Sequence, residues 1–273
     1  MSATAAEAAK IVREEVAGAV GRKGQGSLVI GLAGAQGSGK TTVASTLVEQ
    51  YRVDGFSAAA LSLDDFYLAK AERLRLAARI HPLFETRGPP GTHDVARAID
   101  VIDAIRRGAP VRAPSFDKGV DDRRSPEHDF ALPAALDVLI FEGWCVGATA
   151  EEEASLVAPI NELERKRDPD GVWRRAVNDF LKNAYQDLFA RLDRLAFLRA
   201  PSFDVVCGWR LQQEHDLAAS AAGASALMSP DDVALFIQHY ERITRRMLRE
   251  LPARADLTVN LDADRRIESL TRR

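Results

Sequence analysis

The sequence predicts an α/β protein in which a doubly wound, mainly parallel sheet carries helices on both faces. Two observations lead to this fold class. Short apolar runs, typical of strands buried on both faces, alternate along the chain with longer segments whose apolar residues recur at helical spacing. A glycine-rich loop directly after the first of these runs is the second observation, since such a loop joins a strand to a helix in nucleotide-binding parallel sheets.

The glycine-rich loop follows the buried run Ser27–Ala33 and fits the pattern G-x-x-x-x-G-K-[ST]. Its glycines allow successive backbone N–H groups to point at phosphate oxygens, while Lys40 can reach the β- and γ-phosphates and the Thr41 hydroxyl can ligate Mg²⁺. The helix expected over 41–51 adds the positive end of its dipole. We therefore predict a P-loop NTPase fold with a nucleotide site. The residues of this site are Gly34, Ala35, Gln36, Gly37, Ser38, Gly39, Lys40, Thr41 and Thr42.

The first half of the chain alternates between strand and helix signals. Gly55 interrupts the helical pattern that follows the P-loop, and two prolines with two glycines make 81–94 an irregular loop. Asp94 stands at the start of the next amphipathic pattern, where an acidic side chain complements the helix dipole. Helices are therefore predicted over 4–20, 41–51, 68–80 and 94–107, and strands over 27–33 and 57–63.

The second half begins with a long polar segment, 108–133, that is predicted to be mostly irregular. Asp137–Trp144 follows as the clearest buried strand after the first. A helix with a proline break is expected over 148–167, and its charge run is interpreted as a solvated surface. Ser229-Pro230 is a typical start for the last helix. The remaining predictions are helices over 173–192, 203–222 and 231–251 and strands over 194–200 and 257–261.

Length, composition and charge limit the function. A chain of 273 residues with 46% hydrophobic and 28% charged residues suits one globular α/β domain. The net charge of −3 gives no electrostatic reason to expect nucleic acid or an anionic membrane as a partner, so a basic site for an anionic substrate must be local. Two cysteines, Cys145 and Cys207, do not make a disulfide scaffold, and the N-terminal segment lacks the apolar region of a signal peptide. We expect a cytoplasmic protein, and composition leaves its oligomeric state open.

Carboxylates end two of the predicted strands. Asp64 and Asp65 end the second strand, and Glu142 lies near the end of the third. In open α/β sheets ligands bind at the carboxyl ends of strands, so these side chains are expected beside the P-loop. Adjacent residues point to opposite sides, so one can face the active site while the other ligates Mg²⁺ through water or caps the next helix, and a helix cap is the alternative for either. We favour Asp64 as the base. Glu142 is the candidate Mg²⁺ ligand beside Thr41, and pairing with a core arginine is its alternative.

The irregular loops supply side chains that suit an anionic acceptor. Arg87 and His93 lie in 81–94, and arginine is suited to a bidentate grip on a carboxylate or phosphate, whereas a lone histidine is usually structural. Arg210, on the helix over 203–222, is a candidate lid arginine over the phosphates, with a surface salt bridge as the alternative. The candidate acceptor-binding residues are Asp65, Tyr67, Arg87, His93, Asp117, Lys118 and Arg123.

Seven segments together resemble the D-glycerate 3-kinase family. They are G-A-Q-G-S-G-K-T-T, L-S-L-D-D-F-Y, F-E-T-R-G-P-P-G-T-H-D, P-S-F-D-K-G-V-D-D-R, L-I-F-E-G-W, W-R-L-Q-Q-E and M-S-P-D-D-V. The resemblance runs from about Gly31 to Tyr240, and R-G-P-P-G-T-H-D and E-G-W-C-V-G are more specific than the P-loop. That family looks like a branch of the P-loop kinases that includes uridine kinase, pantothenate kinase and phosphoribulokinase.

The resemblance implies ATP, Mg²⁺ and transfer of the γ-phosphate to the 3-hydroxyl of D-glycerate. With the chain length, it implies a single P-loop kinase domain over 1–273, with an N-terminal helix and loop over 1–26 and a helical lid over 201–225. In the related kinases the Asp two residues before the Phe at this strand end is the base, which agrees with Asp64. One departure is the short Gly119-Val120 stretch after the Asp-Lys loop, which could alter the acceptor pocket. The candidate catalytic residues are Lys40, Asp64 and Arg210.

Three functions fit these residues. The leading one is ATP- and Mg²⁺-dependent phosphorylation of a hydroxyl on a small anionic acceptor. A nucleoside, a pantothenate-like acid or a sugar is the alternative acceptor, although cations near the pocket favour an anion and aromatic residues are only 7% of the chain. A non-catalytic ATP-binding regulatory protein is the third. Asp64 and Glu142 argue against it, because a protein that only binds ATP has no use for a base.

Overall fold

The computed structural model describes residues 3–19, 26–220 and 229–273. Its centre is a six-stranded sheet in the order β10-β9-β8-β1-β7-β2, in which all neighbouring strands are parallel except β9 and β10. The predicted doubly wound, mainly parallel sheet is confirmed. The strands are β1 (Leu28–Gly34), β2 (Ala58–Ser62), β7 (Val138–Gly143), β8 (Arg194–Arg199), β9 (Leu257–Leu261) and β10 (Ile267–Arg272).

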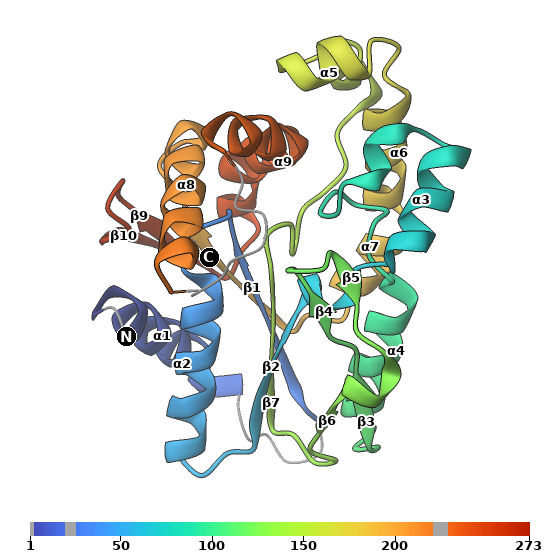
Figure 1. Ribbon diagram of the computed structural model, residues 1–273. Helices are drawn as coiled ribbons and strands as arrows, with labels where there is room; N and C mark the ends of the chain where they lie inside the picture. Colours follow the sequence, from blue (N-terminus) through green and yellow to red (C-terminus); the bar gives the residue numbers. More distant parts are fainter. Residues whose placement is uncertain (1–2, 20–25, 221–228) are drawn as a thin grey trace.

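Helices cover both faces of the sheet (Figure 1). On one face α2 (Lys40–Val53) packs on β1, β2 and β7, and α1 (Ala3–Val16) packs on α2. On the other face α4 (Val95–Arg106) packs against α7 (Ala184–Phe189), with α3 (Lys70–Arg79) on the same side. Because both faces are covered, every residue of β7 is buried, which explains its unbroken apolar run.

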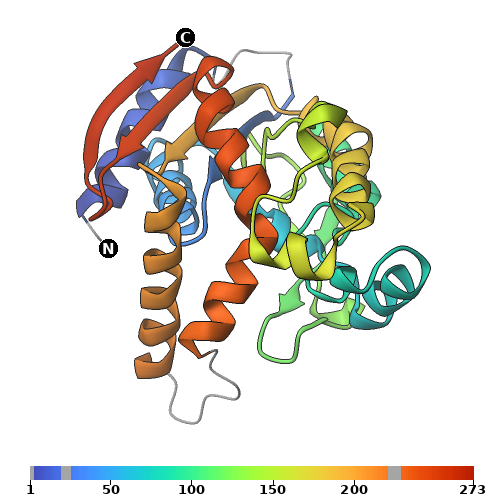
Figure 2. The same ribbon diagram turned by 90° about the horizontal axis from the view of Figure 1, so that it is seen from above.

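The helices α8 (Phe203–Ser220) and α9 (Pro230–Glu250) lie side by side (Figure 2). The start of α9 agrees with its sequence signal, since the Ser229 hydroxyl accepts a hydrogen bond from the backbone N–H of Asp232. Parts of three predicted segments lie outside the described residues: the N-terminal helix and loop over 1–26, the helix over 203–222 and the lid over 201–225. Within the described residues, no helix has both the length and the apolar character needed to cross a membrane.

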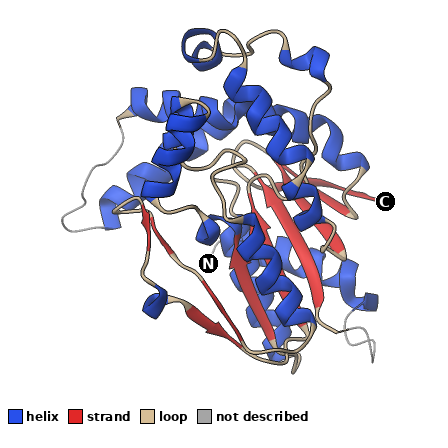
Figure 3. Cartoon of the chain, turned by 90° about the vertical axis from the view of Figure 1, so that its right-hand side faces the viewer, coloured by secondary structure: helices blue, strands red, loops and turns tan. Residues whose placement is uncertain are grey.

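The segment 108–133 is more ordered than predicted. In it β3 (Val111–Ala113) pairs with β6 (Phe130–Leu132), and β4 (Phe116–Asp117) pairs with β5 (Asp122–Arg123), both antiparallel. Figure 3 shows these small hairpins apart from the main sheet. Strands of two or three residues are too short to show an alternating pattern, so the sequence did not indicate them.

Two predicted helices are wrong in extent. The expected helix over 148–167 is replaced by a 3₁₀ turn, Glu153–Leu156, and the short α5 (Glu162–Arg167), because a proline between them cannot continue a helix. The expected helix over 173–192 is divided into α6 (Val172–Lys182) and α7. The division falls at Asn183, whose ψ of −97° is outside the helical region.

The charge run in 148–167 is not only a solvated surface. Glu164 is fully buried, and its carboxylate accepts hydrogen bonds from Arg242 of α9 at 2.8 and 2.6 Å. The Glu151 carboxylate accepts from the same guanidinium at 2.9 Å. These contacts fasten the segment to α9, so the surface interpretation is wrong for these two acids.

Replacing Glu164 by alanine is predicted to destabilise the protein by about 3 kcal/mol, because Arg242 would keep only part of its charge compensation in a buried position. Urea unfolding monitored by circular dichroism measures the change. The matched control is Glu162→Ala, which removes an exposed carboxylate paired with Lys166 and should leave stability nearly unchanged. Equal losses in the two variants would contradict the structural role of Glu164.

Candidate functional site

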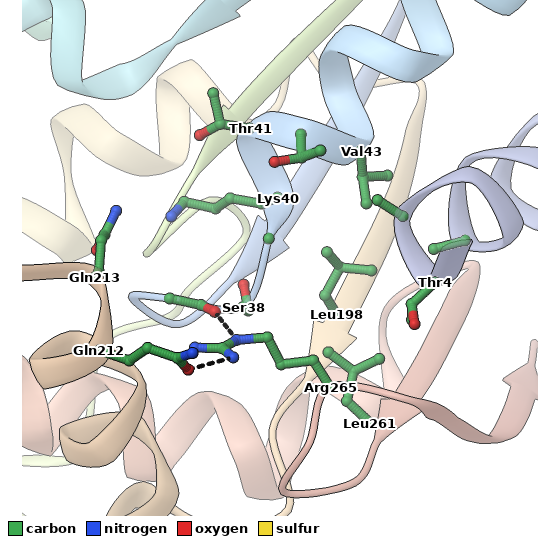
Figure 4. A pocket seen from close by; sticks show the side chains of 15 residues that line it. Thr4, Ser38, Lys40, Thr41, Val43, Leu198, Gln212, Gln213, Leu261 and Arg265 are labelled. Atoms are coloured by element: carbon green, nitrogen blue, oxygen red, sulfur yellow. Dashed lines mark hydrogen bonds between the residues drawn. The ribbon is translucent and has the colours of Figure 1, made fainter. Parts of the chain in front are cut away.

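The P-loop lines a pocket of about 420 Å³ at the carboxyl end of β1 (Figure 4). Residues 37–43, from the loop and the first turn of α2, form one part of its wall. Leu198 of β8 and Leu261 of β9 add apolar surface. Gln212 from α8 and Thr4 from α1 also line it. A pocket with apolar walls and a few polar groups suits a nucleotide. The contribution of α1 to this pocket was not predicted from the sequence.

The backbone of the loop is shaped for an anion. Gly37 and Gly39 have φ of 74° and 88°, which residues with a side chain rarely adopt. A Cβ on Gly37 would lie 2.6 Å from the Cβ of Trp209, so the loop also needs a glycine for its close contact with α8. Because α2 begins at Lys40, its N-terminal N–H groups and its dipole lie at the loop, and the arrangement favours a bound phosphate.

Arg265, in the turn between β9 and β10, is a site residue that the sequence did not reveal. Its Nε donates to the carbonyl oxygen of Gly37 at 2.6 Å, and its Nη1 donates to Gln212 Oε1 at 2.9 Å (Figure 4). The guanidinium carbon lies 5.0 Å from the ring centroid of Trp209, and the residue has a φ of 65°. Arg265 therefore joins the P-loop to α8. The sequence predicted the strand over 257–261 but not its partner β10. The turn residues Asp262–Asp264 were a local signal for the hairpin that these two strands form.

Glu142 and Thr41 meet next to the P-loop. In β7, Glu142 pairs across the sheet with Leu32 of β1 and Ser62 of β2, and its Oε1 accepts a hydrogen bond from the Thr41 hydroxyl at 2.9 Å. Its Oε2 is buried and has no hydrogen-bond partner among the described residues, which is costly unless a cation meets it.

A hydroxyl and a carboxylate are hard oxygen ligands that fit Mg²⁺. The described residues contain no group of three or more acidic, histidine or cysteine side chains placed to hold a metal. Mg²⁺ commonly keeps several waters and takes further ligands from phosphate, so one carboxylate with one hydroxyl is a sufficient protein contribution. The residues present therefore fit the cation that the sequence implies.

Asp64 lies in a short 3₁₀ helix, Leu63–Phe66, directly after β2. Lys118 Nζ lies 2.6 Å from its Oδ2, and the Tyr67 hydroxyl donates to its Oδ1 at 2.9 Å. Burial alone would raise the pKa of Asp64, but the charges of Lys118 and Lys40 outweigh it and hold that pKa well below its usual range. Asp64 is therefore a carboxylate throughout the neutral pH range.

The pKa of Asp65 is shifted in the opposite direction to that of Asp64. Burial, with the neighbouring charge of Asp64 added, raises the pKa of Asp65 to about 6. One acid of the pair is thus fixed as a carboxylate, and the other titrates close to neutrality. A pKa near the working pH favours Asp65 as a base, while the contacts with Lys118 and Tyr67 favour Asp64, so both remain candidates.

Arg87 is held by a second acidic residue. Asp121, with a φ of 56°, accepts hydrogen bonds from Arg87 Nη1 and, at 2.7 Å, from Nη2 of the buried Arg73. Both guanidiniums lie over the ring of Phe116, each 5.6 Å from its centroid. The Tyr240 hydroxyl donates to the Arg87 carbonyl oxygen at 2.9 Å. The structure thus fixes Arg87 firmly, and its pairing with Asp121 uses part of its hydrogen-bonding capacity.

His93 is buried between two tyrosines. Its ring stacks on Tyr67 with 4.5 Å between centroids, and its Nδ1 lies 2.6 Å from the hydroxyl of Tyr185. Burial lowers the pKa of His93 to about 4, so the ring is neutral near pH 7. Since the Tyr67 hydroxyl also bonds to Asp64, the histidine belongs to the same side-chain network as the candidate base.

Comparisons with known proteins agree with this geometry. No protein-family model matches the chain. The uncharacterized kinase mug58 of Schizosaccharomyces pombe is 36% identical over 223 residues, which are 78% of each chain. The chloroplastic D-glycerate 3-kinase of Arabidopsis thaliana is 26% identical over 253 residues, 87% of this chain and 53% of that protein. The chain belongs to the same kinase family as mug58, and its relatives include a D-glycerate 3-kinase.

The fold of this kinase agrees with that of a solved D-glycerate 3-kinase. The D-glycerate 3-kinase of Cryptococcus neoformans has a TM-score of 0.79 at 24% identity, with 100% of both chains covered. The chain spans about half the length of the Arabidopsis relative. The similarity to mug58 makes the protein a kinase, which is a phosphotransferase.

Three predicted site residues of the kinase make other contacts. Asp117 pairs at 2.9 Å with an arginine of its own hairpin, and Arg123 donates to the Tyr67 carbonyl oxygen at 3.0 Å. The guanidinium of Arg210 lies over Phe236 of α9, 5.8 Å from the ring centroid, rather than in the lining of the P-loop pocket. The structure brings Lys118 to the candidate base and does not bring Asp117 or Arg210 there.

Replacing Asp65 by asparagine is predicted to stabilise the kinase at about pH 7.5 and not at about pH 4. The pKa of Asp65 is raised from 3.8 to about 6 on folding, so ionisation of this acid costs stability as pH rises through that window. The cost is complete above the window, and we expect a gain of roughly 1–3 kcal/mol there. Urea unfolding at both pH values measures it, with the exposed Asp170→Asn as the control. A gain of the same size at about pH 4 would contradict the assignment.

Proposed function

We propose that this kinase uses ATP and Mg²⁺ to phosphorylate a hydroxyl of a small anionic acceptor, with D-glycerate to 3-phosphoglycerate as the leading reaction. The observation that supports this most is the pair of Asp64 and Lys118, 2.6 Å apart and under the electrostatic influence of Lys40. A carboxylate that can bind a hydroxyl and an ammonium that can bind an acid group stand side by side, as a hydroxy acid requires. The relatives named D-glycerate 3-kinase add support for this acceptor.

Lys118 is able to change partner at small cost. Its side chain is 60% exposed, so the ammonium can leave Asp64 for another carboxylate while it stays in contact with solvent. In the proposed complex the carboxylate of the acceptor takes Lys118, and the acceptor hydroxyl takes its place beside Asp64. Drawing the ammonium away removes the charge that lowers the pKa of Asp64 most, so binding of the acceptor makes Asp64 a better base.

The other residues have distinct proposed roles. The loop N–H groups and Lys40 hold the triphosphate, while Thr41 and Glu142 hold Mg²⁺, which neutralises charge on the β- and γ-phosphates. Asp64 orients the acceptor hydroxyl and takes its proton. Because the transition state of phosphoryl transfer is loose, the proton needs to leave the hydroxyl only late in the reaction. Arg87 and His93 complete the binding of the acceptor.

A single kinase domain with a lid over 201–225 remains part of the proposal. The described part of this region, α8, contacts the P-loop directly through Trp209, and Gln212 bonds to Arg265. A movement of α8 would therefore act on the phosphate site. In the closed form Arg210 would leave Phe236, steady the transferring phosphoryl group and help to exclude water that would otherwise hydrolyse ATP.

Release of ADP from ATP and Mg²⁺ tests the proposal. D-glycerate, L-glycerate, pantothenate, uridine and a sugar are compared with no acceptor, and Asp64→Asn is assayed beside the wild type. We expect D-glycerate to stimulate turnover most, and Asp64→Asn to lower kcat by a factor of about 10² or more while ATP still binds, because general base catalysis contributes this much.

Two results would contradict the proposal. Stimulation by uridine or a neutral sugar, with none by D-glycerate, would assign another acceptor to the same reaction. Tight ATP binding without turnover on any acceptor would favour a regulatory protein.

Replacing Lys118 by methionine is predicted to raise the KM for the anionic acceptor about tenfold or more, which corresponds to about 1.4 kcal/mol, with little effect on the KM for ATP. Steady-state kinetics in both substrates measure this separation. Lys166→Met removes an exposed lysine that pairs with Glu162 on α5, and it serves as the control. Equal increases in both KM values would place Lys118 at the nucleotide instead.

A further inference from the structure

We infer that Tyr185 is a positioning residue that fixes the tautomer of His93, so that Nε2–H is presented to an oxygen of the acceptor as a neutral hydrogen-bond donor. This inference rests on the proposed function, since it names the atom of the acceptor site that recognises the substrate. Tyr185 lies 92 positions from His93 in the sequence, and its hydroxyl lies 2.6 Å from the Nδ1 of that histidine.

The hydrogen bonds around Tyr185 assign the proton. Tyr185 has no exposed surface, and its hydroxyl oxygen accepts a hydrogen bond from the backbone N–H of Gly91 at 3.1 Å. The phenol has one O–H to donate, and its nearest acceptor is His93 Nδ1 at 2.6 Å. With Nδ1 acting as acceptor, the single proton of the neutral imidazole must be on Nε2.

The Nε2–H group that results has no partner in the protein. His93 is 5% exposed, and its Nε2 is buried without a hydrogen-bond partner among the described residues. A buried donor without a partner destabilises the protein, and a bound ligand that accepts its hydrogen bond would remove that cost. Burial also keeps the ring uncharged at neutral pH, so it donates a hydrogen bond without supplying a proton to the neighbouring base.

The position of His93 connects this donor to the reaction. Tyr67 stacks on the imidazole at 4.5 Å, and its hydroxyl donates to Asp64 at 2.9 Å, while a backbone bridge pairs Tyr67 with His93. A hydroxyl has one proton to donate and lone pairs that accept. An acceptor hydroxyl that donates to Asp64 and accepts from Nε2–H would have its direction fixed before transfer. This geometry favours a substrate with a hydroxyl group, and the proposed pairing of its carboxylate with Lys118 narrows the class to a small hydroxy acid.

Nitrogen NMR tests the tautomer without any turnover. In protein labelled with ¹⁵N at histidine, His93 is assigned by its loss in His93→Gln, and long-range ¹H–¹⁵N spectra tell protonated from unprotonated ring nitrogens. We expect Nε2 protonated and Nδ1 unprotonated at about pH 7. A proton on Nδ1 would overturn the inference, whatever the kinase acts on.

Addition of D-glycerate to the same sample tests contact with the acceptor. We expect the Nε2 resonance to shift as D-glycerate is added, and the shift to saturate over the concentration range set by the KM for D-glycerate. A resonance that does not respond, although turnover of D-glycerate occurs, would show that a buried water or nothing occupies the donor, and it would overturn the inference while leaving the proposed function intact.

Three variants separate positioning from mere packing. The amide nitrogen of glutamine can replace Nε2, whereas that of asparagine lies nearer Nδ1. We expect His93→Asn and Tyr185→Phe to raise the KM for the acceptor roughly tenfold, His93→Gln to raise it less, and the KM for ATP to stay the same. Thermal unfolding of each variant checks that it is folded. Equal losses in His93→Gln and His93→Asn, or parallel rises in both KM values for Tyr185→Phe, would overturn the role.

Discussion

The hydrogen bond from the Thr41 hydroxyl to Glu142 is the constraint on which the rest of the site depends. It joins the first turn of α2 to a buried acid in the middle of the parallel sheet, where an unpaired charge would be expensive. The register of β7 places Glu142 beside Ser62, the last residue of β2, so Asp64 follows within reach of the charge of Lys40 in the phosphate loop. The nucleotide loop, the candidate metal ligands and the candidate base therefore meet because three parallel strands end at one edge of the sheet.

Around that edge the protein satisfies its own charges in pairs that a substrate can rearrange. Asp64 holds Lys118, and Asp121 holds Arg87, so each cation expected to contact an anionic acceptor already has a carboxylate partner. The two pairs differ in strength, because Lys118 is mostly exposed whereas Arg87 is fixed between Asp121 and Phe116. We infer that Lys118 changes partner on binding, while Arg87 acts mainly through its fixed position. A chain with a net charge of −3 can thus still bind an anion locally.

Local patterns in the sequence predict the parts of the site that are built by neighbouring residues. The P-loop, the acids at the strand ends and the Arg87–His93 loop all follow from motifs or strand periodicity. The sequence does not reveal Arg265 or Tyr185, because their contacts with Gly37 and His93 join residues 228 and 92 positions apart. The burial of Glu164 also depends on a tertiary contact, with Arg242 of α9, which the local pattern does not reveal.

Calorimetric titration of ATP, with Mg²⁺ and with a chelator in its place, tests the central claim most directly when the wild type is compared with Glu142→Gln. If Glu142 and Thr41 hold Mg²⁺ against the triphosphate, the wild type should bind ATP more tightly with Mg²⁺, and the variant should lose most of that difference. An unchanged Mg²⁺ dependence in the variant would contradict the account, because the buried acid would then have only a structural role in the sheet.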